Sequence, residues 1–248
     1  LTRVGDLPTG IVDKFSDAGG NNTYKVLPGA WDAIEWSSEL ENLALRCDVV
    51  CFGSLAQRSL RSRRTIVRFL KTMISSGRDT LRVFDVNIRL PEGLSAGERK
   101  AAMAALEPVL KKSIDLCNVL KISEEEASVV SEILTGKSLA GDERAFCREL
   151  LAGNKQLKTV ILTEGGKGNC VFTPGRESAY VIPAGKRRKP VNTVGAGDSF
   201  TAAFCAELMA GSDLWQAQTF ASKVAAFVCR RASATPHYSA AALENFAG

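Results

Sequence analysis

The stretch Pro190-Val-Asn-Thr-Val-Gly-Ala-Gly-Asp-Ser-Phe-Thr-Ala-Ala-Phe204 joins a glycine-rich turn to an apolar, helix-favouring run. An amphipathic helix is expected to begin near Asp198, directly after Gly195, Ala196 and Gly197. Backbone N–H groups at a helix start lack partners, and with the positive end of the helix dipole they bind anions. A carboxylate beside such a pocket can take a proton from a hydroxyl while the donors hold a phosphoryl group. The pattern fits equally a plain turn in which Asp198 is an ordinary helix cap.

The rest of the chain indicates which fold carries this turn. From Cys47 onward, apolar runs alternate with amphipathic stretches, which is typical of βα units on a mostly parallel sheet. The expected strands are Asp48–Phe52, Leu81–Val86, Leu116–Lys121, Thr159–Thr163, Asn169–Thr173 and Ala179–Ile182. The expected helices are Leu60–Ser76, Ala96–Lys112, Glu124–Leu134, Glu143–Ala152, Asp198–Ala210 and Leu214–Arg231. Gly77 and Gly211 fall where helix C-caps are expected.

The N-terminal residues have a different sequence pattern. Two short β-favouring segments, Thr9–Phe15 and Thr23–Leu27, flank a run rich in turn formers, which predicts a β-hairpin. We therefore expect residues 1–30 to form a partial small β lid and residues 31–248 to form an α/β core.

Composition narrows the function classes. The chain has 248 residues, 32 basic and 27 acidic, with a formal net charge of +5. This mild excess falls short of a nucleic-acid-binding signature, and it suits an anionic small ligand as well as a mere surface bias. No apolar run approaches the ~20 residues that span a membrane, and there is no secretory signal. A cytoplasmic protein without nucleic-acid or membrane partners is expected.

The seven cysteines and the single histidine argue against two kinds of chemistry. No Cys-x-x-Cys occurs and His237 is the only histidine, so the ligand spacing for a zinc site is missing. The same scarcity excludes most histidine-based acid–base mechanisms. Reduced, buried thiols are the expected state of the cysteines.

The segment from Asn192 to Phe200 closely resembles the C-terminal signature of the PfkB (ribokinase-like) carbohydrate kinases, Asp-Thr-Val/Thr-Gly-Ala-Gly-Asp-Ser-Phe. The resemblance implies a ribokinase-like fold, a doubly wound and mostly parallel sheet flanked by helices. It also implies that Asp198 is the catalytic base. By the same resemblance, Gly195, Ala196 and Gly197 form the anion hole for the γ-phosphoryl group of ATP.

Two further segments resemble the family pattern. Phe84 to Pro91 is similar to Asp-x-Asn-x-Arg-x-Pro and implies that Asn87 and Arg89 lie in the substrate and phosphate region. Without the resemblance, these could equally be capping and loop charges. Thr163 to Gly168 is similar to the nucleotide-side Thr-x-Gly-x-x-Gly, although by itself it is a weak glycine turn. The nucleotide-binding residues implied by the resemblance are Lys121, Thr163, Gly165 and Gly168.

Three other stretches, Leu7–Gly10, Ala30–Ile34 and Phe52–Arg58, look like the bacterial fructokinases of the family. The implied reaction is phosphorylation of a sugar hydroxyl by ATP with Mg²⁺, with fructose favoured. A kinase for another sugar or for a nucleoside remains open. By analogy with relatives that pair through the lid sheet, a homodimer is expected.

The family pattern is broken in four places. Nothing corresponds to the family's N-terminal segment with its first strands and Gly-Gly motif, so we expect a fragment or a truncated chain. Ser123 replaces the Asn of Asn-x-x-Glu, whose Glu126 remains and would order Mg²⁺ through water. Asn192 replaces an Asp and Ser233 a Gly near a monovalent-cation loop, where a serine would be strained if the backbone needs a positive φ. These replacements weaken the case for the cation, and a catalytically impaired family member is a second interpretation.

Overall fold

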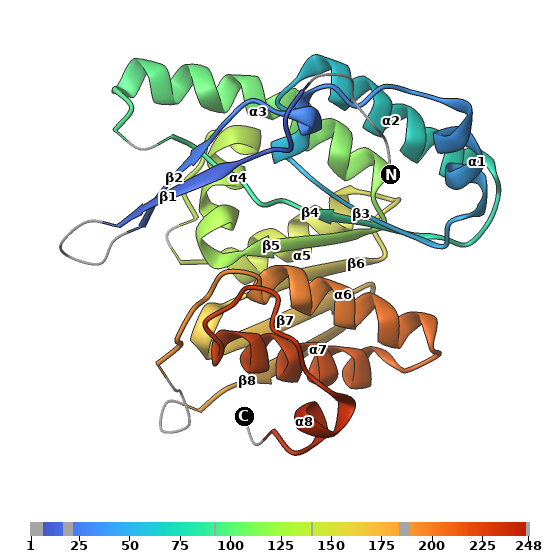
Figure 1. Ribbon diagram of the computed structural model, residues 1–248, viewed down its shortest axis with the longest axis vertical. Helices are drawn as coiled ribbons and strands as arrows, with labels where there is room; N and C mark the ends of the chain where they lie inside the picture. The colour runs from blue at the N-terminus through green and yellow to red at the C-terminus, as the bar shows by residue number, and fades with distance from the viewer. Residues whose placement is uncertain (1–6, 17–21, 92, 140, 184–188, 247–248) are drawn as a thin grey trace. The chain divides into compact units, whose positions relative to one another are not determined.

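The computed structural model describes residues 7–16, 22–91, 93–139, 141–183 and 189–246 (Figure 1). A two-stranded antiparallel sheet pairs β1 (Val12–Ser16) with β2 (Asn22–Val26). The predicted hairpin is therefore confirmed, although part of its connection lies outside the described residues. The other sheet has six strands in chain order: β3 (Val49–Gly53), β4 (Leu81–Asp85), β5 (Val119–Ser123), β6 (Thr159–Thr163), β7 (Gly168–Thr173) and β8 (Arg176–Val181).

Helices alternate with the strands up to β6 and follow the last strand in a run. They are α1 (Ser38–Arg46), α2 (Leu60–Ser75), α3 (Ala96–Leu116), α4 (Glu124–Thr135), α5 (Glu143–Gly153), α6 (Ala196–Met209), α7 (Leu214–Cys229) and α8 (Ala240–Glu244). Short 3₁₀ turns are η1 (Ala30–Asp32), η2 (Leu55–Gln57) and η3 (Gly165–Lys167). The predicted α/β class is confirmed. Gly77 and Gly211, with φ of 70° and 89°, follow α2 and α6 as the predicted C-terminal glycines.

The chain divides into two compact units. The first comprises Leu1–Leu120, Glu125–Gly141 and Asn154–Leu157, and the second comprises Lys121–Glu124, Asp142–Gly153 and Lys158–Gly248. The division into a lid of residues 1–30 and a core of residues 31–248 stays a prediction.

In the first unit, strands β3 and β4 run parallel and bury stacked rings of Phe52 and Phe84, whose centroids are 5.2 Å apart. The buried Gln57 amide donates to the Gly53 carbonyl oxygen (3.0 Å) and to Ser113 Oγ of α3 (2.9 Å). Both amide hydrogens of this buried side chain are thus satisfied, which spares the desolvation cost of an unpaired donor.

The base of the hairpin is fixed to η1 by Trp31. A Cβ at Gly10 would lie 2.4 Å from the Trp31 ring, so only glycine lets the chain pass under the indole. The Arg58 guanidinium lies 5.3 Å above the same ring and donates two hydrogen bonds to the Asp32 carboxylate, at 2.7 and 2.6 Å. Arg58 lowers the pKa of the Asp32 carboxyl.

In the second unit, helices cover both faces of the antiparallel strands β6, β7 and β8. On one face, the buried Gln218 of α7 donates to Asn169 Oδ1 (2.8 Å) and to the Ser178 carbonyl oxygen (3.0 Å). On the other face, the Arg148 guanidinium of α5 lies 5.7 Å from the Phe172 ring. Helix α6 packs beside α7 (Figure 1). The β6–β7 turn and the start of α6 therefore belong to one packed body.

Several predicted bounds were wrong. Strand β5 begins at Val119 rather than Leu116, because α3 continues to Leu116 and its Ser113 carbonyl accepts the Cys117 N–H (2.9 Å). Helix α6 begins at Ala196, two residues before the predicted start. Helices α1 and α8 were missed, although Ser37 and Ser239 cap them through hydrogen bonds from Leu40 N and Ala242 N. Among the described residues, none of the helices has the length and apolarity to cross a membrane.

Candidate active site

The start of α6 is built on Gly195. This residue is the N-cap, with φ of +82°, and a Cβ there would lie 2.4 Å from the Ala234 carbonyl oxygen. Both the left-handed backbone and the close approach require glycine. Ala196 N–H donates to the Thr193 carbonyl (3.3 Å), and the next first-turn donors belong to Gly197 and Asp198. The turn thus presents backbone donors at a helix N-terminus, which is the arrangement that binds anions.

Asp198 lies in the first turn of α6 and is exposed. Because the N-cap is Gly195, which has no side chain to bond, the interpretation of Asp198 as the helix cap was wrong. Within the described ranges, its carboxylate makes no hydrogen bond or ion pair. A carboxylate without a counter-ion at an exposed helix start is able to accept a proton from a hydroxyl brought beside it.

Neutral hydrogen bonds hold this turn. Ser199 Oγ donates to the carbonyl oxygens of Gly195 (2.7 Å) and Ala196 (3.0 Å). Asn192 Oδ1 accepts from Val194 N (3.0 Å), and Asn192 Nδ2 donates to the Ala232 carbonyl oxygen (2.9 Å). The neutral side chains of Ser199 and Asn192 therefore help to fix this backbone.

Lys121 brings a positive charge to the same turn. Its side chain extends from β5 and is only 6% exposed, and a Cβ at Gly197 would lie 3.2 Å from its ammonium nitrogen. A branched side chain at Gly197 would therefore press on the ammonium group. The lysine and the helix N-terminus together make the region suitable for a phosphate group.

The β6–β7 turn carries the other predicted nucleotide-binding residues. Thr163 ends β6, and Gly165 and Gly168 have φ of +54° and +121°. A Cβ at Gly168 would lie 1.9 Å from the Tyr180 carbonyl oxygen, whereas one at Gly165 would meet no atom within 4 Å. Glycine is thus required at the base of the turn for space, and the crest at Gly165 is open to a ligand.

The remaining predicted residues belong to the first unit, and the structure brings them together there. Asn87 follows β4 with φ of +42°, the only positive φ of a non-glycine residue in the described part of the chain. Its carbonyl oxygen accepts from Ser54 Oγ (3.2 Å). Glu126 Oε1 accepts from Ile88 N (3.0 Å), and the exposed Arg89 donates to the Ile88 carbonyl (3.0 Å). Strained backbone of this kind is common at binding sites.

The donor set decides what cation the chain could hold. Among the described residues, no group of three His, Cys, Asp or Glu side chains could hold a metal ion. Magnesium is commonly held by one or two carboxylates together with substrate phosphates, and the single carboxylate of Glu126 fits that class. Ser233 does not have the positive φ that would have strained it, and its Oγ accepts from Thr235 N (3.1 Å).

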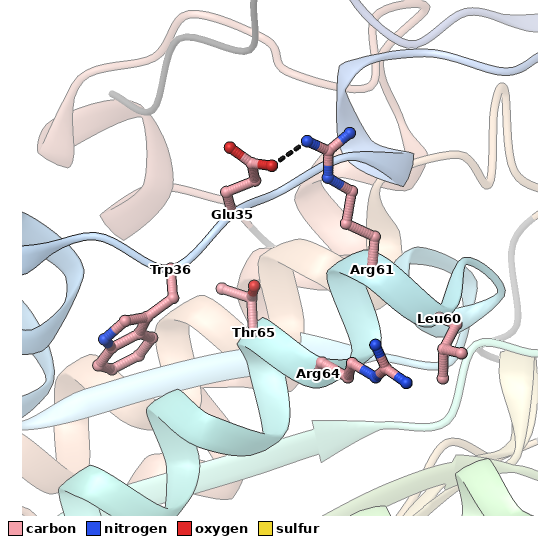
Figure 2. Close-up of a pocket in the computed structure, with 6 residues that line it drawn as sticks. All are labelled: Glu35, Trp36, Leu60, Arg61, Arg64 and Thr65. Carbon is pink, nitrogen blue, oxygen red and sulfur yellow. Dashed lines mark hydrogen bonds and ion pairs between the residues drawn. The ribbon is translucent and has the colours of Figure 1, made fainter.

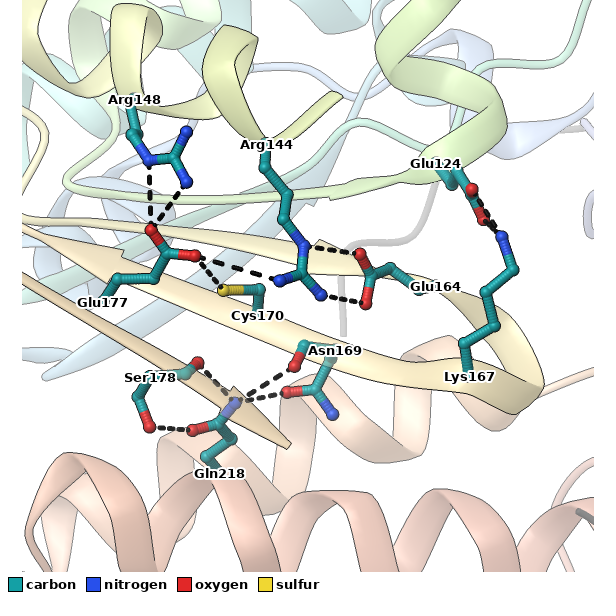
Figure 3. A network of polar contacts seen from close by, with 10 residues as sticks. All are labelled: Glu124, Arg144, Arg148, Glu164, Lys167, Asn169, Cys170, Glu177, Ser178 and Gln218. Atoms are coloured by element: carbon teal, nitrogen blue, oxygen red, sulfur yellow. Dashed lines mark hydrogen bonds and ion pairs between the residues drawn. The ribbon is translucent and has the colours of Figure 1, made fainter. Parts of the chain in front are cut away.

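Sequence reasoning missed the side chains that hold the β6–β7 turn. Arg144 of α5 donates two hydrogen bonds to the Glu164 carboxylate, both at 2.9 Å, and Lys167 Nζ lies 2.6 Å from Glu124 Oε1 (Figure 3). The adjacent opposite charges of Glu164 and Lys167 within the glycine turn were the available signal. Their partners lie 20 and 43 residues away, so pairing depended on the fold.

A cavity of about 410 Å³ lies elsewhere, in the first unit (Figure 2). It is lined by Glu35, Trp36, Leu60, Arg61, Arg64 and Thr65. Arg61 is ion-paired with Glu35 across its rim. None of the predicted site residues lines this cavity, which separates it from the candidate active site.

Comparison with known proteins gives one family. The model described as pfkB family carbohydrate kinase matches residues 1–240. Fructokinase-2 from Solanum lycopersicum is 30% identical over 146 residues, which are 59% of this chain and 39% of the relative. The chain spans less than half the length of Fructokinase-2 and of two probable fructokinases from Arabidopsis thaliana that it also matches.

Solved structures agree on the fold. Fructokinase from Vibrio cholerae, with fructose, ADP and calcium bound, superposes with a TM-score of 0.69 at 22% identity, covering 95% of this chain and 72% of that one. Ribokinase from Arabidopsis thaliana, with ribose and ATP, gives a TM-score of 0.68 at 21% identity, covering 98% and 71%. The predicted ribokinase-like α/β fold is confirmed by these likenesses.

Proposed function

The chain belongs to the pfkB family of carbohydrate kinases, and on that premise we propose that the protein transfers the γ-phosphoryl group of ATP to a hydroxyl of a sugar. The observation that carries the proposal is the start of α6. There, the exposed carboxylate of Asp198, which has no partner among the described residues, stands in the same helical turn as the backbone donors that follow Gly195. The Lys121 ammonium group lies against that turn at Gly197.

These residues have separate roles in the transfer. A sugar hydroxyl attacks phosphorus poorly until its proton is removed, and Asp198 accepts that proton as the new O–P bond forms. The bond from the γ-phosphorus to the bridging oxygen breaks, and ADP leaves with the electron pair. The N–H groups of the turn and the Lys121 ammonium group stabilise the negative charge of the transferring group.

Other residues bind and orient the reactants. Thr163, Gly165 and Gly168 would form the nucleotide side, with the open crest of the β6–β7 turn against the nucleotide. Asn87 and Arg89 would contact the substrate and phosphate region. Glu126 would hold Mg²⁺ through water, and the bound metal would neutralise charge on the phosphates.

Fructose is the acceptor that we favour. The support is the chain's similarity to proteins named fructokinase, at about 30% identity. The likeness to ribokinase keeps ribose, or a nucleoside, as the alternative acceptor.

A second candidate function is binding without turnover. Asn192 and Ser123 depart from the family pattern, and the Asn192 amide is committed to the Ala232 carbonyl oxygen. A neutral amide there leaves no carboxylate for a monovalent cation. The carboxylate of Asp198, unpaired in the part of the chain that the structure describes, favours the active enzyme over this alternative.

The purified protein should be tested for ADP release with fructose, ribose, glucose and adenosine, and with no acceptor as the control for ATP hydrolysis. We expect fructose to give the highest kcat/KM. Release with none of the acceptors, with ATP binding intact by calorimetry, would support the impaired member instead. Absence of ATP binding at millimolar nucleotide would rule out both the active kinase and the protein that binds ATP without turnover.

A further inference from the structure

The crest of the β6–β7 turn is the 3₁₀ turn η3 (Gly165–Lys167), which Lys167 N closes by donating to the Glu164 carbonyl oxygen (3.0 Å). At the base, Glu164 N donates to the Gly168 carbonyl (2.9 Å) and Ile182 N to the Lys167 carbonyl (2.9 Å). Gly165 is exposed and has open space where a side chain would be. Two glycines in sequence give a crest with many accessible conformations unless something else selects one.

Two ion pairs anchor this turn, one on each side of the crest (Figure 3). The Arg144 guanidinium of α5 meets the Glu164 carboxylate in a two-point contact at 2.9 Å for each hydrogen bond. Lys167 Nζ lies 2.6 and 2.7 Å from the two oxygens of Glu124, at the junction of β5 and α4. The crest is thus held between two elements that flank strand β6.

The arginine contact is the stronger of the two. The Glu164 side chain is 13% exposed, whereas the lysine pair has side chains that are 54% and 37% exposed. A planar, two-point contact also fixes direction, which a lysine ammonium group does not. Exposed lysine pairs contribute little to stability on their own. Arg144 is therefore the side chain that fixes Glu164, which lies between Thr163, already placed by the β6–β7 ladder, and the open Gly165.

The next arginine along α5 provides a natural contrast. Arg148 donates two hydrogen bonds to Glu177 Oε2, at 3.0 and 2.9 Å, and so makes a contact of similar kind on the same helix face. Glu177, however, lies within strand β8, where the ladder with β7 already fixes its backbone. Arg148 therefore contacts only a strand whose backbone the ladder already fixes, whereas Arg144, which also lies 4.0 Å from Glu177 Oε1, makes its two-point contact with the turn.

Resting on the proposed function, we propose that Arg144 is a positioning residue for the nucleotide: through Glu164 it holds the β6–β7 turn in the conformation that receives ATP. It does not touch the reacting atoms. Without it, the turn must be ordered when ATP binds, and that ordering weakens ATP binding. The step from the bound complex onward is unaffected, because the proposed base, Asp198, lies on α6 and makes no hydrogen bond or ion pair with Arg144 or Glu164.

The test compares Arg144→Met with Arg148→Met as the matched control, measuring KM for ATP, KM for the sugar, kcat, ATP affinity by calorimetry and melting temperature. For Arg144→Met we expect ATP binding ~3- to 10-fold weaker, the loss that corresponds to ordering one or two groups. Sugar KM and kcat at saturating ATP should stay within about 2-fold. Arg148→Met should change the melting temperature about as much as Arg144→Met does. It should leave the KM for ATP unchanged.

Two further variants keep the outcome decisive. Arg144→Lys retains the charge but not the two-point contact, so ATP binding should be intermediate, and it replaces Arg144→Met if that variant fails to fold. Glu164→Gln removes the same pair from the other side, so ATP binding should be weakened about as much as in Arg144→Met. Unchanged ATP binding in a folded Arg144 variant, or equal weakening in Arg148→Met, would overturn the positioning role alone. A wild-type protein that binds no ATP would overturn the proposed function and the positioning role with it.

Discussion

The Thr163–Gly168 turn and the Gly195–Asp198 turn both depend on glycines that cannot be replaced without collision, yet they are held in place by opposite means. The first is anchored by charges, with Arg144 on Glu164 and Lys167 on Glu124. The second is anchored by hydroxyl and amide groups, and within the described residues the carboxylate of Asp198 remains unpaired.

The difference follows from what each turn has to do. A carboxylate in an ion pair has its oxygens engaged by a cation, so it is less available to take a proton from a substrate hydroxyl. An ion pair on Glu164 does not impair the phosphoryl transfer, because the first turn is proposed only to bind the nucleotide. Anchoring the second through neutral groups leaves its one carboxylate free to accept a proton.

The largest expected effect comes from replacing the glycine at the base of the Thr163–Gly168 turn. Gly168→Ala should lower the free energy of unfolding by at least ~3 kcal/mol, since its φ of +121° is nearly restricted to glycine and a Cβ would lie 1.9 Å from the Tyr180 carbonyl oxygen. Denaturant titration gives this value. Gly165→Ala is the control, because its left-handed φ costs only about 1–2 kcal/mol and no atom is close. Equal losses for the two variants would show that the collision is relieved at little cost.

A smaller effect is expected at the neutral anchor of the second turn. Asn192→Asp removes the donor to the Ala232 carbonyl and sets a carboxylate against it, so stability should fall by about 1–3 kcal/mol. Potassium placed between the two oxygens would restore part of that loss.

Melting temperatures in potassium chloride and choline chloride test this point. The wild-type protein and Asn192→Ala should each have the same melting temperature in both salts. Asn192→Asp should melt a few degrees higher in potassium chloride than in choline chloride. A strong potassium response of the wild-type protein would show that the amide does not abolish the cation site.

Sequence patterns predicted local features better than distant pairings. The start of α6 could be predicted because glycine, small residues and an apolar run are adjacent in the chain, although the left-handed Gly195 placed it two residues earlier. The end of α3 was missed because apolar residues continue from its last turn into β5 with no glycine or proline between the two elements. The left-handed Asn87 was not foreseen either, because its conformation is imposed by contacts such as the one from Ser54.

The site residues that could be predicted from the sequence are likewise those that lie in contiguous motifs. Family motifs lie on contiguous residues and marked Asp198, Gly195 and Thr163. The Arg144–Glu164 pair joins α5 to the β6–β7 turn across 20 residues, and only packing of α5 on the sheet brings the two side chains together.

The most direct test of the account is the turnover number of Asp198→Asn, measured with ATP affinity and melting temperature on the same preparation. The amide keeps the shape of the side chain but cannot accept the hydroxyl proton. Turnover should therefore fall by at least ~10²-fold, with ATP affinity nearly unchanged and stability lowered by no more than about 1 kcal/mol from the lost charge in the first helical turn. Turnover within a few-fold of the wild-type value would contradict the role of Asp198 as the base.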